Sequence, residues 1–449
     1  MLHTMGLREL LLQRLGLKQS LRVSIVLLTA LYLSGCGTSK AMIEGDRITI
    51  LDNTDGQDAS GFAPYIDLPM PFENLQWTQF NGSSRRTMTH VAVNPDVKEV
   101  WKKKIGAPSD GALGHLGAPP VIVGEYVYTM DARSKISAYN SLTGATYWEY
   151  VNDSDGDKGG FGGGLAASGT HLFVTLGLGE VLCLDTETGI LLWKKELSAP
   201  VRAAPALYGD VVIVVSRDDK AFGLDAETGA IKWSFQGVRG ELSSIGAAVP
   251  AADRGIAVIP FSSGEIVAVR VSTGERIWTR VIDSGSATSL LSVFTEIAGG
   301  PVIYSDRVIA SSYSGALVSL DLNTGMVQWK RNMGSYNPVW VTRETLFFIS
   351  DDAKVISLRV KDGKTIWRTQ LPQFAKPKKR MDAIVYSGPV LASNRVYVVS
   401  SEGKILQFDA KTGAMLSSFD FGKTIMVGPV FANKALYILD KNNMLYKME

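Results

Sequence analysis

Residues 406–416 read LQFDAKTGAML, which is an apolar strand, a tight turn and a second apolar strand. Asp409 opens the turn, where its carboxylate accepts hydrogen bonds from the amides that follow, and Thr412 does so more weakly. Gly413 closes the turn, because glycine takes a positive φ without a Cβ clash, as a turn with a G1 bulge requires. The stretch therefore predicts two antiparallel strands joined at Gly413.

The same pattern occurs six more times upstream. In the clearest copies an Asp-x-x-Thr-Gly turn is followed by Trp, as in Gly189 with Trp193, Gly229 with Trp233 and Gly325 with Trp329. Weaker copies, in which Asn or Arg replaces the leading Asp, are Gly144 with Trp148, Gly274 with Trp278 and Gly363 with Trp367. In the copy at Gly413, Phe419 stands near the place of Trp. The turn glycines lie 38 to 51 residues apart, which is the period of a propeller blade.

A second pair of strands precedes each turn, as at residues 388–392 and 395–400, so each repeat holds four short strands. After the last turn, residues 425–447 supply only three strands. The missing one lies near the N-terminus, at residues 97–101, where VKEVW has the Trp of an outer strand without a preceding turn. We expect an all-β fold: an eight-bladed β-propeller of four-stranded antiparallel blades. Its ring is closed by pairing of the N-terminal strand with the C-terminal strands, which buries exposed edges.

The N-terminal region has the features of a targeting segment. Four Arg or Lys residues precede a short apolar run at residues 23–33, which is too short to span a bilayer comfortably and typical of a signal peptide. We expect a lipoprotein signal peptide over 1–35, a flexible lipid-anchored tether over 36–75 and the propeller over 76–449. A single ring overrides the two or three domains that a length of 449 residues would suggest.

The signal ends in Leu33-Ser34-Gly35-Cys36, which resembles the bacterial lipobox, in which the cysteine is acylated and becomes the mature N-terminus. Cys36 is thus the expected lipid anchor. Gly37 stands where that system's inner-membrane retention signal would place Asp, so the resemblance implies an outer-membrane location facing the periplasm. Cys183, the other cysteine, then has no disulfide partner and is expected to be a buried, inert thiol.

Charge and composition exclude nucleic acid as a partner. The signal carries four basic residues and one acidic residue, a charge of +3, so removing it from the formal +2 leaves the mature chain at −1. No basic patch typical of nucleic-acid binding is present. The local basic run at residues 376–380, KPKKR, is interpreted as a solvated loop between strands.

Catalytic and metal-binding patterns are weak. Asp153 to Asp157 invites a calcium interpretation, but position 158 holds Lys where an EF-hand loop needs Gly, so a solvated loop is favoured. Of the four histidines, no two of His90, His115 and His171 have metal-ligand spacing. No nucleophile signature is present either. We predict no cofactor, metal or catalytic residues. A catalytic pair of carboxylates on the propeller axis stays an open alternative, because residues from all blades meet at the axis.

The repeat, seen nearly whole at residues 223–233, resembles the quinoprotein (PQQ-type) propeller repeat and covers about residues 97–449. One branch with this repeat, the quinoprotein alcohol dehydrogenases, binds PQQ and calcium on the axis and carries an adjacent Cys-Cys pair, which this chain lacks. The other branch is the BamB family of outer-membrane lipoproteins, which this chain is similar to in length, in its lipobox and in its inferred eight blades. That resemblance implies no catalytic activity.

The BamB family binds the POTRA domains of the barrel subunit BamA through loops on one face, and this chain matches parts of those loops. Val238-Arg239-Gly240-Glu241 matches an aliphatic-Arg-Gly-Glu loop between blades. Glu296 stands in the next inter-blade segment, where the family has an acidic loop, but with one acid where the family often has two. The resemblance therefore implies partner binding by Val238, Arg239, Glu241 and Glu296. The alternative is that Arg239 and Glu296 are ordinary loop charges.

These observations favour a non-catalytic scaffold of the outer-membrane β-barrel assembly machinery, which docks on BamA and aids insertion of outer-membrane proteins. Unfolded outer-membrane proteins are expected as further partners, held at exposed blade edges by β-augmentation. Two other functions stay open. One is a PQQ-dependent dehydrogenase or a hydrolase with an axial site, and the other is a propeller that binds peptidoglycan or another envelope polysaccharide.

Overall fold

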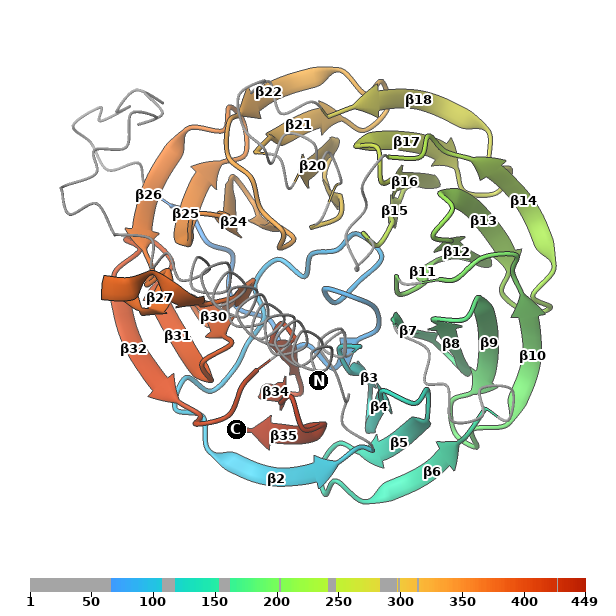
Figure 1. Ribbon diagram of the computed structural model, residues 1–449, viewed down its shortest axis with the longest axis horizontal. Coiled ribbons are helices and arrows are strands. Elements are labelled where there is room, and N and C mark those ends of the chain that lie inside the picture. The colour runs from blue at the N-terminus through green and yellow to red at the C-terminus, as the bar shows by residue number, and fades with distance from the viewer. Residues whose placement is uncertain are drawn as a thin grey trace, which may run out of the picture. The chain divides into compact units, whose positions relative to one another are not determined.

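Eight four-stranded antiparallel sheets stand as blades around a central axis in the computed structural model (Figure 1). It describes residues 66–106, 118–152, 162–201, 203–240, 248–282, 297, 299–312, 315–425 and 427–449. The prediction of an eight-bladed β-propeller is confirmed. In the described ranges, no helix has the length and apolar character needed to cross a membrane.

The first four blades follow one another along the chain. Blade 1 has β3 (Val121–Val123), β4 (Tyr126–Met130), β5 (Ile136–Asn140) and β6 (Thr146–Tyr150). Blade 2 has β7 (Gly163–Ser168), β8 (His171–Leu176), β9 (Glu180–Asp185) and β10 (Leu191–Glu196). Blade 3 has β11 (Ala206–Tyr208), β12 (Val211–Val215), β13 (Lys220–Asp225) and β14 (Ile231–Gln236). Blade 4 has β15 (Ala251–Asp253), β16 (Ile256–Pro260), β17 (Glu265–Arg270) and β18 (Arg276–Val281).

The last four blades complete the ring. Blade 5 has β19 (Val302–Tyr304), β20 (Arg307–Ser311), β21 (Leu317–Asp321) and β22 (Val327–Arg331). Blade 6 has β23 (Trp340–Thr342), β24 (Thr345–Ile349), β25 (Lys354–Arg359) and β26 (Thr365–Gln370). Blade 7 has β29 (Tyr386–Ala392), β30 (Arg395–Ser400), β31 (Lys404–Asp409) and β32 (Met415–Asp420). Blade 8 has β33 (Val430–Ala432), β34 (Ala435–Leu439), β35 (Met444–Met448) and, as its outer strand, β2 (Glu99–Lys104).

Blade 8 joins the two ends of the propeller. β2 pairs antiparallel with β35, and Trp101 lies opposite Lys447. The predicted ring closure by an N-terminal strand is therefore confirmed, and the Trp without a preceding turn was its signal in the sequence.

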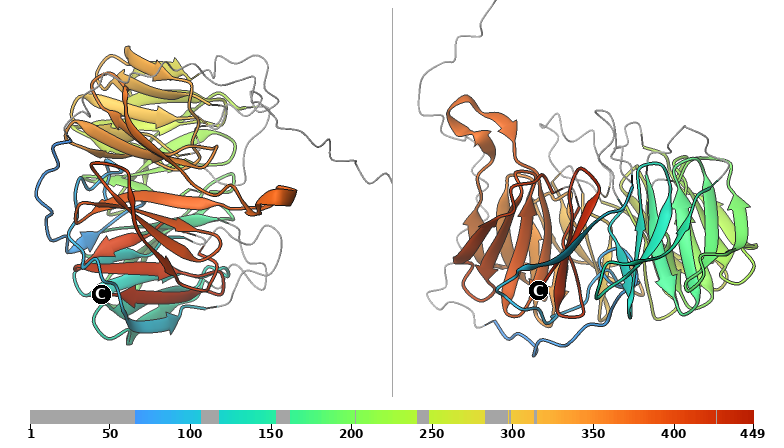
Figure 2. Two further views of the ribbon diagram at one scale, coloured as in Figure 1. Left: turned by 90° about the vertical axis from the view of Figure 1, so that its left-hand side faces the viewer. Right: turned by 90° about the horizontal axis from the view of Figure 1, so that it is seen from below.

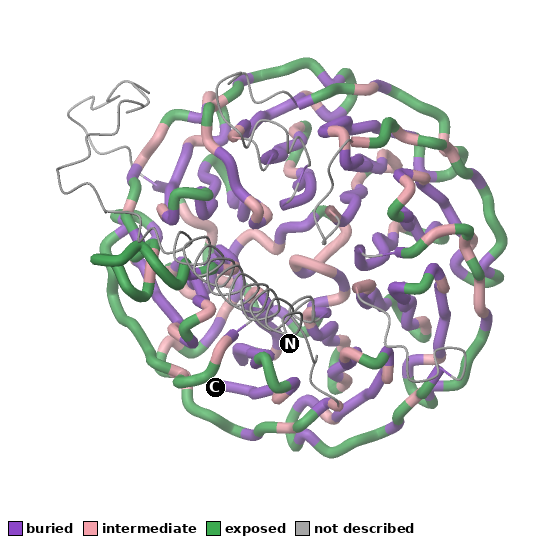
Figure 3. The backbone as a smooth tube through the Cα atoms, viewed as in Figure 1, coloured by how far each residue is buried: buried purple, intermediate pink, exposed green. Residues whose placement is uncertain are grey.

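The apolar character of each strand follows its distance from the axis. Middle strands such as β12 are buried along their whole length, because neighbouring blades cover both faces. Outer strands expose most residues and bury one, as in β14, where Trp233 is the buried residue. As Figure 3 shows, burial is dense in the middle of each blade and sparse on the rim.

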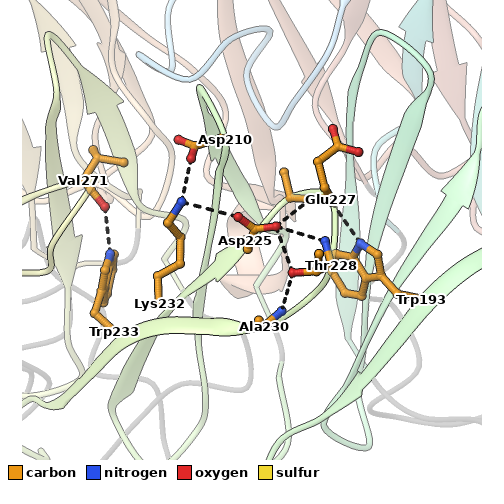
Figure 4. Close-up of polar contacts among 10 residues, drawn as sticks. Trp193, Asp210, Asp225, Glu227, Thr228, Ala230, Lys232, Trp233 and Val271 are labelled. Carbon is orange, nitrogen blue, oxygen red and sulfur yellow. Dashed lines mark hydrogen bonds and ion pairs between the residues drawn. The ribbon is translucent and has the colours of Figure 1, made fainter.

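The Asp-x-x-Thr-Gly turns between third and fourth strands have the geometry that their residues predict (Figure 4). Asp225 Oδ1 accepts hydrogen bonds from the Glu227 amide at 3.2 Å, the Thr228 amide at 3.0 Å and the Thr228 hydroxyl at 2.9 Å. Those bonds, above all that from the hydroxyl, hold the pKa of Asp225 below its ordinary value. Gly229 closes the turn at a φ of +69°.

Each turn is also the docking site for a tryptophan of the preceding blade. Trp193 Nε1 of blade 2 donates to the Ala226 carbonyl at 2.9 Å, and its ring lies so close to Gly229 that a Cβ there would be 2.6 Å away. Seven such bonds lock neighbouring blades: Trp101 to Ser141, Trp148 to Thr186, Trp193 to Ala226, Trp233 to Val271, Trp278 to Leu322, Trp329 to Val360 and Trp367 to Ala410.

Blade 7 lacks this tryptophan for a topological reason. Ser417 lies opposite Gln407, in the register position that Trp193 and Trp233 hold in their blades, so Ser417 and not Phe419 occupies the place of Trp. The next blade, blade 8, has no turn between its third and fourth strands, because β35 ends near the C-terminus and β2 comes from the N-terminal part. A tryptophan on β32 would have no turn to bind.

An extended segment, residues 66–93, lies inside the ring and is called the axial segment here (Figure 1, blue). Its β1 (Gln76–Trp77) adds to the inner edge of blade 1, and the Trp77 ring stacks on Trp340 of blade 6 at a centroid distance of 5.9 Å. The sequence predicts residues 66–75 as part of the tether. In the structure they belong to the axial segment, and its first residue, Ile66, is buried.

The axial segment bonds to the innermost strand of every blade, or to the turn that follows it. The partners in blades 1 to 4 are Ile122 for Trp77, Ala167 for Thr78, Leu207 for Gln79 and Ala252 for Ser84. Those in blades 5 to 8 are Ile303 for Arg85, Val341 for Thr87, Leu391 for Val91 and Asn433 for Asn74. No blade depends on its two neighbours alone, because all eight share this one strip of chain.

The propeller has two different faces. We call the face with the Asp-x-x-Thr-Gly turns the turn face and the face with the connections between blades the loop face. The axial segment lies toward the turn face, where its Asp67 pairs with Arg343 of the turn between β23 and β24. A hairpin of β27 (Phe374–Lys376) and β28 (Met381–Ala383) projects from the loop face, so hairpin and axial segment are on opposite sides (Figure 2).

His90 of the axial segment must be neutral in the folded chain. Its ring is fully buried, with Nδ1 2.6 Å from the Pro69 carbonyl, and Nε2 accepts the Asn394 amide hydrogen at 2.8 Å. Burial lowers the pKa of His90, and the bond to Pro69 opposes that effect only in part. Because the charged form is favoured more in the unfolded chain, stability from this site is complete above about pH 6.5 and is lost as the pH falls below it.

The blade locks predict a strong effect of Trp233. We expect Trp233→Ala to lower the free energy of unfolding by about 3–5 kcal/mol. For Trp233→Phe, which removes the bond to Val271 and part of the ring but keeps an aromatic group in the seam, we expect a smaller loss of about 1–3 kcal/mol. Ile231→Ala on the same strand is the control, because Ile231 is 44% exposed and its change should cost little. Equal shifts of the urea midpoint in Trp233→Ala and Ile231→Ala would contradict the lock.

The neutral ring of His90 predicts acid sensitivity. We expect the urea midpoint of the wild type to fall more steeply between pH 7.5 and pH 5 than that of His90→Gln, whose side chain does not titrate. Parallel pH profiles of wild type and His90→Gln would show that the ring does not couple protonation to folding.

Candidate docking loop

Residues Val238–Gly240 leave blade 3 after β14 and begin the connection to blade 4 on the loop face. Val238 is 58% exposed, and Arg239 is exposed next to it. No carboxylate among the described residues lies within ion-pair distance of Arg239. An apolar side chain and a guanidinium thus stand side by side toward solvent.

The backbone under these two side chains is held by polar groups of blades 3 and 4. The Val238 amide donates to Glu265 Oε2 at 2.8 Å, and the Gly240 amide donates to Ser262 Oγ at 2.8 Å. Glu265 and Ser262 are both buried. Their bonds fix the backbone on either side of Arg239, so its Cα has a defined position while its side chain stays free.

A third residue, Asp219, supports the second of these bonds. Its carboxylate accepts the Ser262 hydroxyl at 2.6 Å and the Ser262 amide at 2.8 Å. Burial raises the pKa of Asp219, while the bonds from Ser262 and the positive charge of Arg239 oppose the rise. Arg239 therefore contributes to the electrostatics of the network as well as to the exposed surface.

Close backbone contact explains the two glycines of the loop. A Cβ on Gly237 would lie 2.4 Å from the Phe261 ring, and one on Gly240 would lie 2.6 Å from the Ser262 carbonyl oxygen. Any side chain at these positions would push the loop away from blade 4. The loop shape is thus set by packing on both sides of the Val238–Arg239 pair.

The structure describes only part of the predicted site. It describes Val238 and Arg239, whereas Glu241, Glu296 and Cys36 lie outside the described residues. Sequence reasoning missed the supporting residues Asp219, Ser262 and Glu265. Asp219 and Ser262 stand in short turns, where Asp and Ser are common for local reasons, so only their spatial pairing shows their role.

Other chemistry-bearing residues have structural surroundings. Cys183 is fully buried in β9, and burial raises the pKa of its thiol to about 12, which fits the expected inert cysteine. Among the described residues, no group of three His, Cys, Asp or Glu side chains is placed to hold a metal ion. The basic run 376–380 lies in the β27–β28 hairpin, where its side chains are exposed and Lys376 pairs with Asp382 at 2.6 Å.

Comparison with known proteins identifies the family. Residues 132–369, more than half of the chain, match the family model described as outer membrane protein assembly factor BamB. The chain belongs to the BamB family. The resemblance inferred from the turn repeat is thereby confirmed, and the matched region includes Val238 and Arg239 of the candidate loop.

Full-length relatives agree with this assignment. The BamB of Yersinia pestis is 25% identical over 355 residues, which cover 78% of this chain and 88% of the relative. The BamB of Escherichia coli K12 is 24% identical over 354 residues, with coverage of 78% and 88%. Both carry the name outer membrane protein assembly factor, and neither name denotes an enzyme.

Solved structures share the fold. The crystal structure of BamB from Moraxella catarrhalis aligns with a TM-score of 0.66 at 20% identity, covering 79% of this chain and 99% of that one. A quinohemoprotein alcohol dehydrogenase from Comamonas testosteroni aligns with a TM-score of 0.65 at 13% identity, covering 83% and 80%. At these identities the likeness shows the propeller alone, so fold cannot separate the two branches; the BamB family match does.

The loop support predicts a pH-dependent effect of Ser262. We expect Ser262→Ala to lower the free energy of unfolding by about 1–3 kcal/mol, because Asp219 and the Gly240 amide lose a buried partner. The loss should be larger at pH 7 than at pH 4, since the ionised carboxylate is the form that needs the donor. Ser263→Ala is the matched control. A loss that is the same at both pH values would contradict the role of the hydroxyl.

Proposed function

We propose that this BamB-family chain is a non-catalytic scaffold of outer-membrane protein assembly that docks on the POTRA domains of a BamA-like barrel subunit through the Val238–Arg239 loop. The observation that carries the proposal is an exposed Val–Arg pair on a backbone held by Glu265 and Ser262. The matched loop of the family supports the choice of partner, and we propose that Glu241 and Glu296 contribute to the same interaction.

Arginine suits this role for physical reasons. The Arg239 guanidinium, which has no carboxylate within ion-pair distance among the described residues, can offer two parallel N–H donors to a partner carboxylate, and interface anchors are enriched in Arg. The fixed backbone lowers the entropy lost on binding, since only the side chain of Arg239 has to be ordered. Val238 adds apolar contact area beside the charged pair.

The axial segment supports a scaffold rather than an enzyme with an axial site. It fills the interior of the ring toward the turn face with bonds to all eight blades, and its Arg86 is buried, donating to the carbonyls of Pro250 and Phe80. The turn-face side of the ring interior is thus occupied by the chain's own residues. We propose that partners are met on the outer surfaces.

We further propose that Cys36 is acylated and anchors the protein to the outer membrane, with the propeller in the periplasm. The 29 residues 37–65 separate Cys36 from Ile66, the first described residue of the axial segment. A chain of that length, if fully extended, reaches about 100 Å, which is long enough for an anchored propeller to meet a membrane-embedded partner.

The docking proposal predicts that Arg239→Glu abolishes co-purification of the barrel subunit. Reversing the charge should weaken binding by more than about tenfold, because a paired interface charge is typically worth about 2–5 kcal/mol. Arg239→Lys should have an intermediate effect, since an ammonium does not make the bidentate pair. The measurement is a quantitative pull-down of the detergent-solubilised, tagged protein from its own membranes.

Arg368→Glu is the matched control, because Arg368 is an exposed residue on the outer strand of blade 6. It should co-purify the barrel subunit like the wild type, and circular dichroism should show that all variants keep their fold. Undiminished co-purification by Arg239→Glu would place the interface elsewhere. Recovery of glycan or of a soluble enzyme system in place of the assembly subunits would overturn the function itself.

A further inference from the structure

The outer strand of blade 7, β32, differs from the other seven outer strands in burial. All six of its residues are exposed, whereas every other outer strand buries a tryptophan. Met415 is 54% exposed, Leu416 48% and Phe419 41%. Exposed apolar residues at the start of an outer strand also occur in a locked blade, since Leu191 and Leu192 of β10 are 37% and 47% exposed. What the missing lock adds is exposure along the whole strand, because Ser417 holds the Trp position and blade 8 presents no turn for it.

β32 also lacks the basic side chains that most of the other outer strands carry. Edge strands expose unpaired amides and carbonyls, and natural sheets commonly protect them with Lys or Arg. In six of the other outer strands such residues are present: Lys102 in β2, Lys194 in β10, Lys232 in β14, Arg276 in β18, Lys330 in β22 and Arg368 in β26. In β6 the charge is Glu149. β32 has no charge before its last residue, Asp420.

The strand register shows which backbone groups face outward. The Phe421 amide donates to the Gly403 carbonyl at 2.8 Å, so this opposed pair is hydrogen-bonded. Because bonded and non-bonded pairs alternate in an antiparallel ladder, Phe419 opposite Ile405 bonds inward. Ser418, opposite Leu406, then directs its N–H and C=O away from the blade. No fifth strand pairs with this edge among the described residues.

We propose that β32 is the edge to which an extended, uncharged segment of an unfolded outer-membrane protein adds as a fifth strand of blade 7. The inference rests on the proposed function and specifies where a client is held. Main-chain hydrogen bonds recognise a strand of any sequence, which suits a factor with many clients. Membrane-spanning β-strands are uncharged on their lipid-facing side, and the apolar, cation-free β32 is the rim segment that matches them.

The position of β32 makes client binding compatible with docking. In Figure 1, β32 and the end of β14, where the Val238–Arg239 loop begins, lie on opposite sides of the ring. A client on β32 would extend a blade sideways and would leave the loop between blades 3 and 4 uncovered. Both partners are therefore expected to bind at the same time.

The test uses a fluorescent peptide of about ten residues that copies one strand of an eight-stranded outer-membrane barrel. Its anisotropy is titrated with the full-length, detergent-solubilised protein. Ser418→Pro removes the outward N–H and leaves the inward ladder intact, while Ser418→Lys adds the missing edge charge. We expect both variants to bind the peptide about two- to tenfold more weakly than the wild type, as expected for the loss of one hydrogen bond.

Blade 3 provides the matched control. Ser234 of β14 is exposed and lies opposite Phe222 in the same register as Ser418 opposite Leu406. Ser234→Pro and Ser234→Lys should bind the peptide like the wild type. Wild-type affinity in Ser418→Pro, or an equal loss in Ser234→Pro, would overturn the proposal. So would a dimer, seen by light scattering, that Ser418→Pro converts to monomer, because a second copy would then cover the edge.

Co-purification of the barrel subunit separates this inference from the proposed function. Ser418 variants should still co-purify it, since their docking loop is unchanged. If the wild type fails to co-purify assembly subunits but binds the peptide in a Ser418-dependent manner, the proposed docking function is wrong, whereas the assignment of β32 as the strand-binding edge is supported. If docking is normal and peptide binding is insensitive to Ser418, the edge assignment falls alone.

Discussion

The rest of the structure depends on the contact between a tryptophan on one blade and the turn glycine of the next. The indole of Trp193 lies on Gly229 and donates to Ala226, so a single motif makes the hairpin of its own blade and the seam with its neighbour. Glycine is required twice over, by its positive φ and by the absence of a side chain under the ring. Seven seams are built in this way; the eighth, between blades 7 and 8, has no such tryptophan and is packed by other side chains, such as Tyr397 against Phe431 at a ring-centroid distance of 5.1 Å.

Much of the fold could be predicted from the sequence because its decisive chemistry is local. An Asp, a Thr and a Gly within five residues define the turns at Gly189, Gly229, Gly325 and Gly413, and the unmatched Trp101 indicates how the ring closes. The axial segment could not be predicted, since Gln79 bonds to Leu207 and Thr87 to Val341 across 128 and 254 residues without any periodic pattern. For the site, family resemblance indicated Arg239, but the Asp219–Ser262 bond beneath it spans two blades and has no sequence signature.

Rigidity and function are divided between the interior and the rim. The interior is fixed by the axial segment and by blade seams, so loops such as Val238–Gly240 stand on an immobile support and lose little freedom on binding. Two irregularities stand out in the second half of the ring. The β27–β28 hairpin is inserted between blades 6 and 7, and the outer strand of blade 7 is exposed along its whole length where the repeating contact has no partner in blade 8.

The axial segment has a consequence for the order in which the protein matures. It is made first, yet Asn74 binds Phe431, 357 residues later in the chain. Contacts between such distant residues form slowly, because a long loop must close before they contribute any stabilisation. A chain that emerges from its N-terminus onward must therefore carry this segment without its partners until blade 8 exists. Premature capture of the segment by another chain would stall maturation, so a propeller of this design benefits from chaperoned delivery of its own nascent form.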